Sequence, residues 1–139
     1  MRISSLSPYQ KITIIRVSRP SHKNLNDELQ WFGTSLGLFS LRDKDKSCFR
    51  IFIELLKETR KKNALTSDQL AERLKLSRAT VLHHLDKLFS AGIVVADRNR
   101  YYLRVETLSY LVDELKKDVD RMVDDLKDVA SEIDRALGL

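Results

Sequence analysis

A polar ridge in the middle of the chain carries the residue types best suited to recognising another molecule. Its four members recur at i, i+3, i+4 and i+7, and they are Thr80, His83, His84 and Lys87. This spacing places side chains on one face of a helix, with Asp86 off the stripe. The ridge offers donors, acceptors and a cation, which suits base edges in the major groove of DNA. Ser77 and Arg78 stand before it, where a helix N-terminus favours phosphate or guanine. An ordinary solvent-exposed helix face is the alternative interpretation.

Patterns typical of catalysis and metal binding are missing from the sequence. No nucleophile stands beside a base, and there is no phosphate-binding glycine loop and no pair of carboxylates at catalytic spacing. Cys48 is the only cysteine, and its apolar setting favours a buried small side chain over a redox role. His83 and His84 are adjacent, so on a helix their side chains diverge by about 100° and do not chelate one ion together. We expect no enzyme, no metal ion and no cofactor, and the sequence identifies no small-molecule effector.

The charge is unevenly distributed along the chain. Residues 1–105 contain 20 lysines and arginines against 10 acids, whereas residues 106–139 contain 5 against 10. A basic body joined to an acidic tail favours a polyanionic partner for the body alone. No apolar run approaches the roughly 18 to 20 residues that span a bilayer, and residues 1–20 lack a signal-peptide hydrophobic block. We therefore expect a cytoplasmic protein without a membrane partner.

Capping residues mark two short helices around the polar ridge. Thr66 and Gln69 form a capping box at the start of the first helix. Ser77 reads as the N-cap of a second helix that runs from residue 78 to about 91 and is closed by Gly92. Two short helices separated by a three-residue turn are the core of a helix-turn-helix.

A β-hairpin is predicted directly after the second helix. The β-rich runs 93–96 and 100–105 are separated by three polar residues, of which Asn99 tolerates a positive φ. Such a hairpin is a wing, and Arg98 and Arg100 bracket its tip, where cations meet the DNA backbone or minor groove. Alternation places Arg104 on the outer face with Tyr102, and it turns three side chains toward the core: Tyr101, Leu103 and Val105.

The preceding residues are predicted to form a core helix and an N-terminal extension. From 43 to 62, apolar residues at helical spacing form a stripe, with two more at its edge: Phe49, Phe52, Ile53 and Leu56, widened by Ile51 and Leu55. Residues 11–17 are β-branched and predict a short strand. Residues 26–36 predict a short helix with an Asn cap.

Residues 107–137 predict one long helix with a heptad repeat. Its first seam holds Val112, Val119, Leu126 and Ile133, and its second holds Leu108, Leu115, Met122, Val129 and Ala136. At 1.5 Å per residue the helix is roughly 45 Å long, more than so small a body covers. We expect the seam to pair with a second copy of the chain; a stripe folded back on its own domain is the alternative. The charges beside the seam leave parallel and antiparallel pairing open.

The run from Leu70 to Leu88, LAERLKLSRATVLHHLDKL, followed by Ala91-Gly-Ile-Val94, resembles the ArsR-type winged-helix regulators, especially archaeal ones. The resemblance covers about residues 47–105. It implies that Arg78, Thr80, His83, His84 and Lys87 lie in a DNA-reading helix, that the terminal helix forms a homodimer, and that the operator is partly palindromic. Lys75 stands where the family commonly has glycine, and we expect that this turn does not require a positive φ. The metal-ligand sets of the metal-sensing members are missing.

These patterns predict a mainly α fold with a small β wing, a winged helix-turn-helix plus a long C-terminal dimerisation helix. The expected parts are an N-terminal extension (1–42), the DNA-binding domain (43–105) and a coiled-coil helix (106–139). The predicted function is a homodimeric, sequence-specific transcriptional regulator that binds double-stranded DNA. The alternative is a winged-helix protein-interaction module in a larger transcription or replication assembly.

Overall fold

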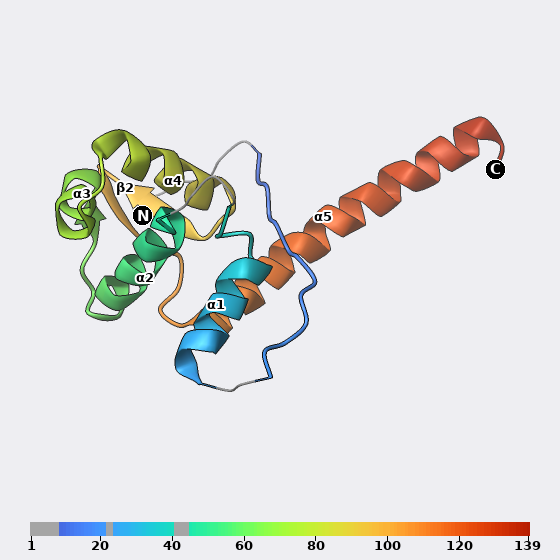
Figure 1. Ribbon diagram of the computed structural model, residues 1–139. Coiled ribbons are helices and arrows are strands. Elements are labelled where there is room, and N and C mark those ends of the chain that lie inside the picture. The colour runs from blue at the N-terminus through green and yellow to red at the C-terminus, as the bar shows by residue number, and fades with distance from the viewer. Residues whose placement is uncertain (1–8, 22–23, 41–44) are drawn as a thin grey trace.

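The computed structural model describes residues 9–21, 24–40 and 45–139. Its elements are α1 (Leu25–Ser35), α2 (Ser47–Arg60), β1 (Leu65–Thr66), α3 (Ser67–Leu74), α4 (Arg78–Ser90), β2 (Val94–Asp97), β3 (Arg100–Leu103) and α5 (Leu108–Leu137). Figure 1 shows a rounded body from which α5 extends as a rod. The predicted class, a winged helix-turn-helix with a long C-terminal helix, is confirmed. The predicted first residues of the core helix, 43 and 44, and the boundary after residue 42 lie outside the described residues.

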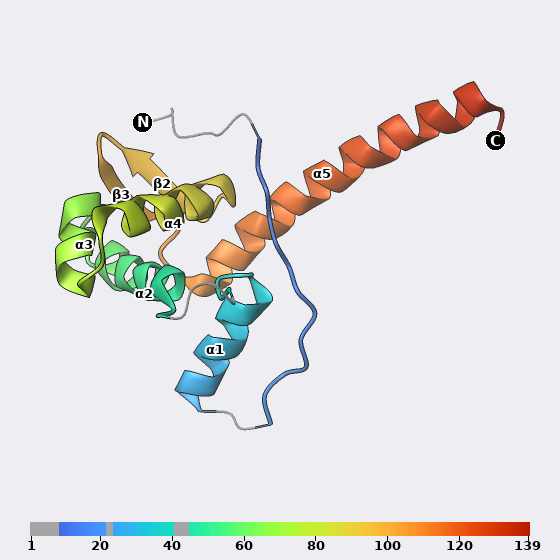
Figure 2. The same cartoon turned by 45° about the horizontal axis from the view of Figure 1, so that its top comes forward.

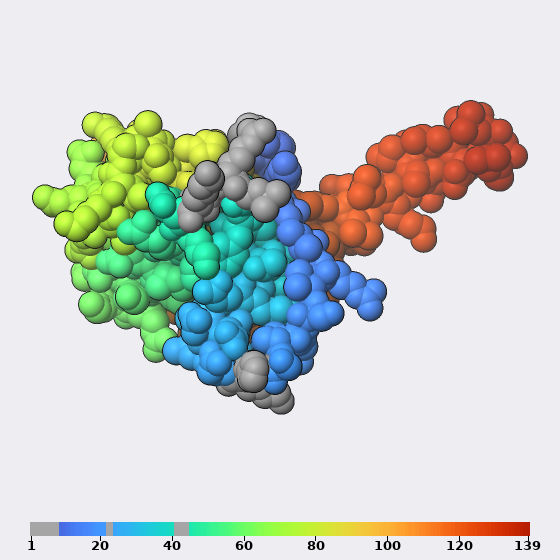
Figure 3. Space-filling model, in the orientation of Figure 1, coloured from blue at the N-terminus to red at the C-terminus, as the bar shows by residue number. Residues whose placement is uncertain are grey.

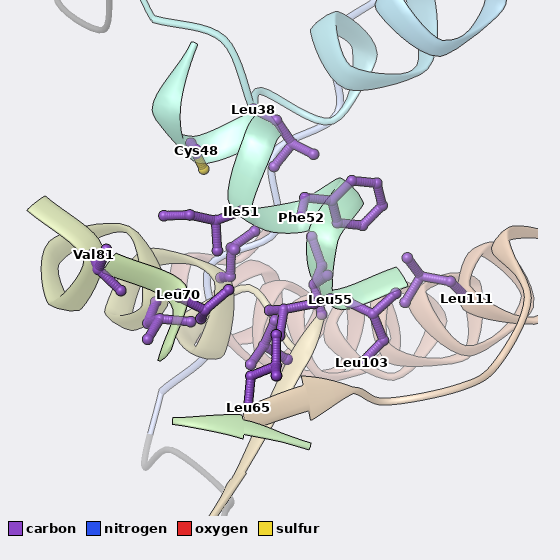
Figure 4. Close-up of a cluster of buried hydrophobic side chains, with 14 of the residues drawn as sticks. Leu38, Cys48, Ile51, Phe52, Leu55, Leu65, Leu70, Val81, Leu103 and Leu111 are labelled. Atoms are coloured by element: carbon purple, nitrogen blue, oxygen red, sulfur yellow. The ribbon is translucent and has the colours of Figure 1, made fainter. Parts of the chain in front are cut away.

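The core is built around α2. Ile51, Phe52 and Leu55 are fully buried, whereas Phe49 and Leu56 are half-buried. The centre of the apolar stripe therefore includes Ile51 and Leu55, which the sequence pattern had placed at its edge. Figure 4 shows side chains from the strand β3 and from α5 converging on this helix, with Leu103 and Leu111 beside Leu55. Burial of such side chains supplies the main driving force for folding.

A three-stranded antiparallel sheet of order β1-β3-β2 closes one side of the core. The predicted hairpin is present, with Val94 opposite Leu103 and Asp97 opposite Arg100. The strand β1 was not predicted, because two residues are too few to show a period. It pairs with β3 through Leu65 opposite Tyr101. β3 is thereby held from both sides.

The N-terminal segment differs from its prediction. Residues 11–17 are extended but form no strand. Their backbone amides bond to the ends of helices and not to a partner strand. Lys11 N donates to Ser90 O at 3.0 Å and Ile15 N donates to Ser35 O at 2.7 Å. The helix α1 is capped by Asn24 and not by Asn26.

The two halves of α5 have different surroundings. Leu111 and Leu115 are buried against the body, whereas the second half stands clear of it in two orientations and in the space-filling view (Figures 1, 2 and 3). The extended N-terminal segment passes across α5 where the helix leaves the body (Figure 2). Among the described residues, no helix is long and apolar enough to cross a membrane.

Candidate nucleic-acid interface

The turn before α4 is fixed by local bonds from both sides. Thr66 and Gln69 form the predicted capping box of α3. Arg50 Nη2 donates to Leu74 O at 2.6 Å and so binds the last turn of α3 to α2. Ser77 Oγ accepts from Thr80 N at 3.1 Å, as expected of an N-cap. These bonds orient α4 against the core.

Lys75 contradicts the prediction for this turn. It adopts φ 57° and ψ 48°, the left-handed region that residues other than Gly, Asn and Asp rarely occupy. The turn therefore does need a positive φ, and the lysine bears a strain that glycine would not.

The exposed face of α4 is rotated by about one residue position from the predicted ridge. Its exposed members are Arg78, Ala79, Leu82, His83, Asp86 and Lys87. Thr80 is half-buried, and His84 is only 8% exposed. His84 follows Val81 at i+3, in the buried row that Leu85 and Leu88 continue, so helical geometry turns it inward. The predicted exposure of His84 on the ridge is therefore wrong, and its role in reading DNA stays a prediction. Asp86 lies on the exposed face after all.

Two hollows flank this face. One of about 770 Å³ runs between α4, the turn and the start of α2. It is lined by the lysines Lys75 and Lys87, by hydroxyl and histidine side chains, and by the acid Asp45. The other, of about 240 Å³, lies between α4 and the wing, where Leu82 and Asp86 meet Ala96 and Tyr101. The helix face is therefore a ridge between the wing and the start of α2, a shape that can enter a DNA groove.

The wing tip presents two of the predicted cations. Arg98 and Asn99 have φ 52° and 69°, the two consecutive positive values of a tight type I′ turn. Both Arg98 and Arg100 are exposed, and Arg100 Nη1 lies 3.4 Å from Ala64 O. Arg78 lies 3.7 Å from Asp68 in an exposed ion pair, which solvent weakens enough to leave Arg78 available for phosphate.

Arg104 does not belong to this surface. Its guanidinium donates to both carboxylate oxygens of Asp118 on α5, at 2.6 and 3.2 Å. Glu114 lies 3.4 Å away on the same helix. Burial by itself raises the pKa of Asp118, but hydrogen bonds from Arg104 and Gln10 and the charge of nearby arginines outweigh it, so the pKa lies below its ordinary value. The predicted outward position of Arg104 is wrong because it joins the wing to α5.

The predicted seam of α5 is divided between two environments. Leu108 is half-buried and Leu115 is 4% exposed, and both pack in the chain's own core. Val119 and Met122 are half-buried. Four further members are exposed to between 45 and 69%: Val112, Leu126, Val129 and Ile133. The first part of the seam thus folds back on its own domain, which corrects the assignment of Leu108 and Leu115 to pairing.

Sequence reasoning missed three residues that organise the site. Leu111 is fully buried although it lies off the heptad seam. Gln10 and Asp118 form a contact between distant parts of the chain, at 2.8 Å. The only signal was that Asp118 follows Leu111 and Leu115 at i+7 and i+3 on one helix face. Within the described ranges, no cluster of three His, Cys, Asp or Glu side chains could hold a metal ion.

Comparison with known proteins identifies one part of this arrangement. A family model described as an HTH domain matches residues 51–103, which extend from α2 through α3 and α4 to the end of β3. No curated protein and no solved structure matches the chain. Residues 51–103 are a helix-turn-helix DNA-binding domain.

Proposed function

We propose that the chain is a transcriptional regulator that binds a specific site in double-stranded DNA as a homodimer. The observation that carries this proposal is the exposed face of α4, which lies beside a cationic wing inside the matched helix-turn-helix domain. Arg78 and Lys87 are exposed on this face, and Lys75 is exposed in the turn before it. Arg98 and Arg100 continue the positive charge on the wing. The run from 70 to 94 favours a relationship to ArsR-type regulators, archaeal ones especially. We propose no catalytic activity.

Base recognition would come from the middle of α4, and affinity from its flanks. His83 and Asp86 can exchange hydrogen bonds with base edges, and Leu82 can contact a thymine methyl group. The cations at either side would contact phosphates, which position the helix without specifying the sequence. If all five cations of both copies bind phosphate, log K falls with log salt with a slope of up to about −9.

Pairing would use the second half of α5. Leu126, Ile133 and Leu137 are 69, 51 and 67% exposed along one face, a continuous apolar surface that water covers unfavourably. A second copy supplies the same face, and a two-fold dimer is the arrangement that places two reading helices on two half-sites.

Binding is tested with a duplex selected from a random-sequence library by the wild-type protein. In fluorescence anisotropy titrations, Arg78→Ala and Lys87→Ala should each raise Kd at least several-fold and make the salt slope shallower by about 1 for each phosphate that the variant no longer binds. Lys117→Ala removes an exposed lysine from α5 and is the matched control. Equal Kd values for all four proteins would reject α4 as the DNA-binding helix.

Pairing is tested by light scattering at micromolar concentration. The wild-type chain should be a dimer, and Leu126→Glu with Ile133→Glu should be a monomer because two carboxylates would be buried in the interface. Ser131→Glu adds one carboxylate off the seam and should remain dimeric, as a control for added negative charge on α5. A monomeric wild-type protein would contradict the homodimer and favour a different partner for α5.

A further inference from the structure

Asp118 is a buried acid at the point where α5 leaves the body. Leu111, Leu115 and Asp118 follow one another at i, i+4 and i+7 and are 0, 4 and 3% exposed. No later residue of α5 is buried among those the structure describes. A carboxylate is costly to bury unless it is paired and hydrogen-bonded, so its place in this otherwise apolar row calls for specific partners.

Those partners come from three separate parts of the chain. Arg104, directly after β3, donates two hydrogen bonds to the carboxylate, at 2.6 and 3.2 Å. Gln10 Nε2, in the N-terminal segment, donates to Asp118 at 2.8 Å and lies 3.1 Å from Ala91 O at the end of α4. Arg121, one turn along α5, donates as well. The carboxylate therefore connects α5 to both DNA-reading elements, the wing and the recognition helix.

The contacts of this junction are close and directional. A Cβ atom at Gly92 would lie 2.2 Å from Gln10 Nε2, so the glycine admits the glutamine side chain against the end of α4. The two-pronged contact between Arg104 and Asp118 is directional, because a guanidinium and a carboxylate match only in a narrow range of orientations. Packing of Leu111 and Leu115 sets the approximate direction of α5, with a scatter of about 15 to 20° that is typical of helix packing, and the ion pair adds a directional contact where this packing ends.

We propose that Asp118 is a positioning residue that fixes the angle at which α5 leaves the body, and thereby the separation of the two recognition helices. The inference rests on the proposed homodimer. From Asp118 to Leu137 the helix is a lever of roughly 28 Å at 1.5 Å per residue, so a change of about 10° displaces its end by roughly 5 Å. Base pairs are about 3.4 Å apart along a duplex. A swing of about 7° therefore displaces the end of the helix by about one base-pair rise, which is enough to change the preferred half-site separation.

The angle is measured by spin labelling of the full-length protein. One nitroxide on Asp97→Cys at the wing, in a Cys48→Ser background, gives a single label-to-label distance in the dimer. We expect a narrow distribution with Asp118 present. Asp118→Asn should broaden it at least two-fold or shift its mean by several ångströms, and Gln10→Ala, which removes one bond, should do so less. Asp125→Asn, an exposed acid seven residues further along α5, is the matched control and should change nothing.

DNA supplies a second readout. The two selected half-sites are moved apart or together one base pair at a time, and Kd is measured for each duplex. Asp118→Asn should flatten the preference for one spacing while it leaves the dimer and binding to a single half-site intact, which a merely structural role would not do. Unchanged distances and spacing preference in folded Asp118→Asn and Gln10→Ala overturn the inference but leave the homodimer standing. Absence of any label-to-label distance in the parent protein overturns both.

Discussion

Arg104 holds Asp118 by two hydrogen bonds, of 2.6 and 3.2 Å, between the end of the wing and the helix α5. Arg104 follows β3, whose other end is the wing tip, and Asp118 precedes the exposed half of α5. A single ion pair thus joins the surface that we propose for DNA binding to the surface that we propose for pairing. The contribution of this ion pair to stability should depend on pH and be lost on mutation of Asp118.

Asp118→Asn should lower the free energy of unfolding at pH 7 by about 1 to 3 kcal/mol, because the amide cannot accept the same charge-assisted bonds. The pKa of Asp118 is lowered from 3.8 in the folded chain. Its contribution is therefore present above the unfolded pKa and is lost as the pH falls through the lower folded pKa. In urea unfolding between pH 7 and pH 2, the free energies of unfolding of the wild type and the variant should converge as the pH falls. Parallel curves would contradict the account, and Asp125→Asn should follow the wild type.

Lys75→Gly should stabilise the protein by about 1 kcal/mol, since glycine adopts the left-handed conformation without the clash of a Cβ atom. For a chain of this size the melting temperature should rise by about 2 to 4 °C. Lys75→Ala loses the same charge but retains the strain, so it should not share the increase. Both variants should weaken DNA binding equally if Lys75 contacts phosphate. A melting temperature for the glycine variant no higher than that of the alanine variant would contradict a strained Lys75.

The adjacent histidines should separate into a DNA-contacting residue and a core residue. His83→Ala should raise Kd for DNA without changing the melting temperature, because His83 is exposed on α4. His84 is 8% exposed, so His84→Ala should cost about 1 to 3 kcal/mol of stability, as substitutions in packed positions do. Thermal melts and anisotropy titrations on both variants decide this. The opposite assignment would show that the exposed face of α4 has been placed incorrectly.

Local patterns predicted most of the fold. The capping box at Thr66, the N-cap at Ser77 and the closing Gly92 each act within a few residues, so the sequence around them suffices to place α3 and α4. An uninterrupted heptad pattern likewise predicts the long helix α5. Pairing in β1 depends on β3, more than 30 residues away, and no local pattern reports such a contact.

The orientation of side chains within the site was harder to predict than the elements. The residue type alone does not show whether a histidine on a helix is buried or exposed. His84 was therefore assigned to the wrong face. Strand alternation would turn Arg104, directly after β3, outward, but Asp118 on α5 holds it against the body. In both cases local spacing fits an inward and an outward position equally well, and tertiary contacts decide between them.

The central claim is that two copies present the exposed faces of α4 to one side of a single duplex. Hydroxyl-radical footprinting of the wild-type protein on its selected duplex tests it most directly. We predict two protected patches on one face of the DNA, about one helical turn apart and related by two-fold symmetry, both lost with Arg78→Ala and Lys87→Ala combined. A single patch, or protection that survives this double substitution, would contradict the account.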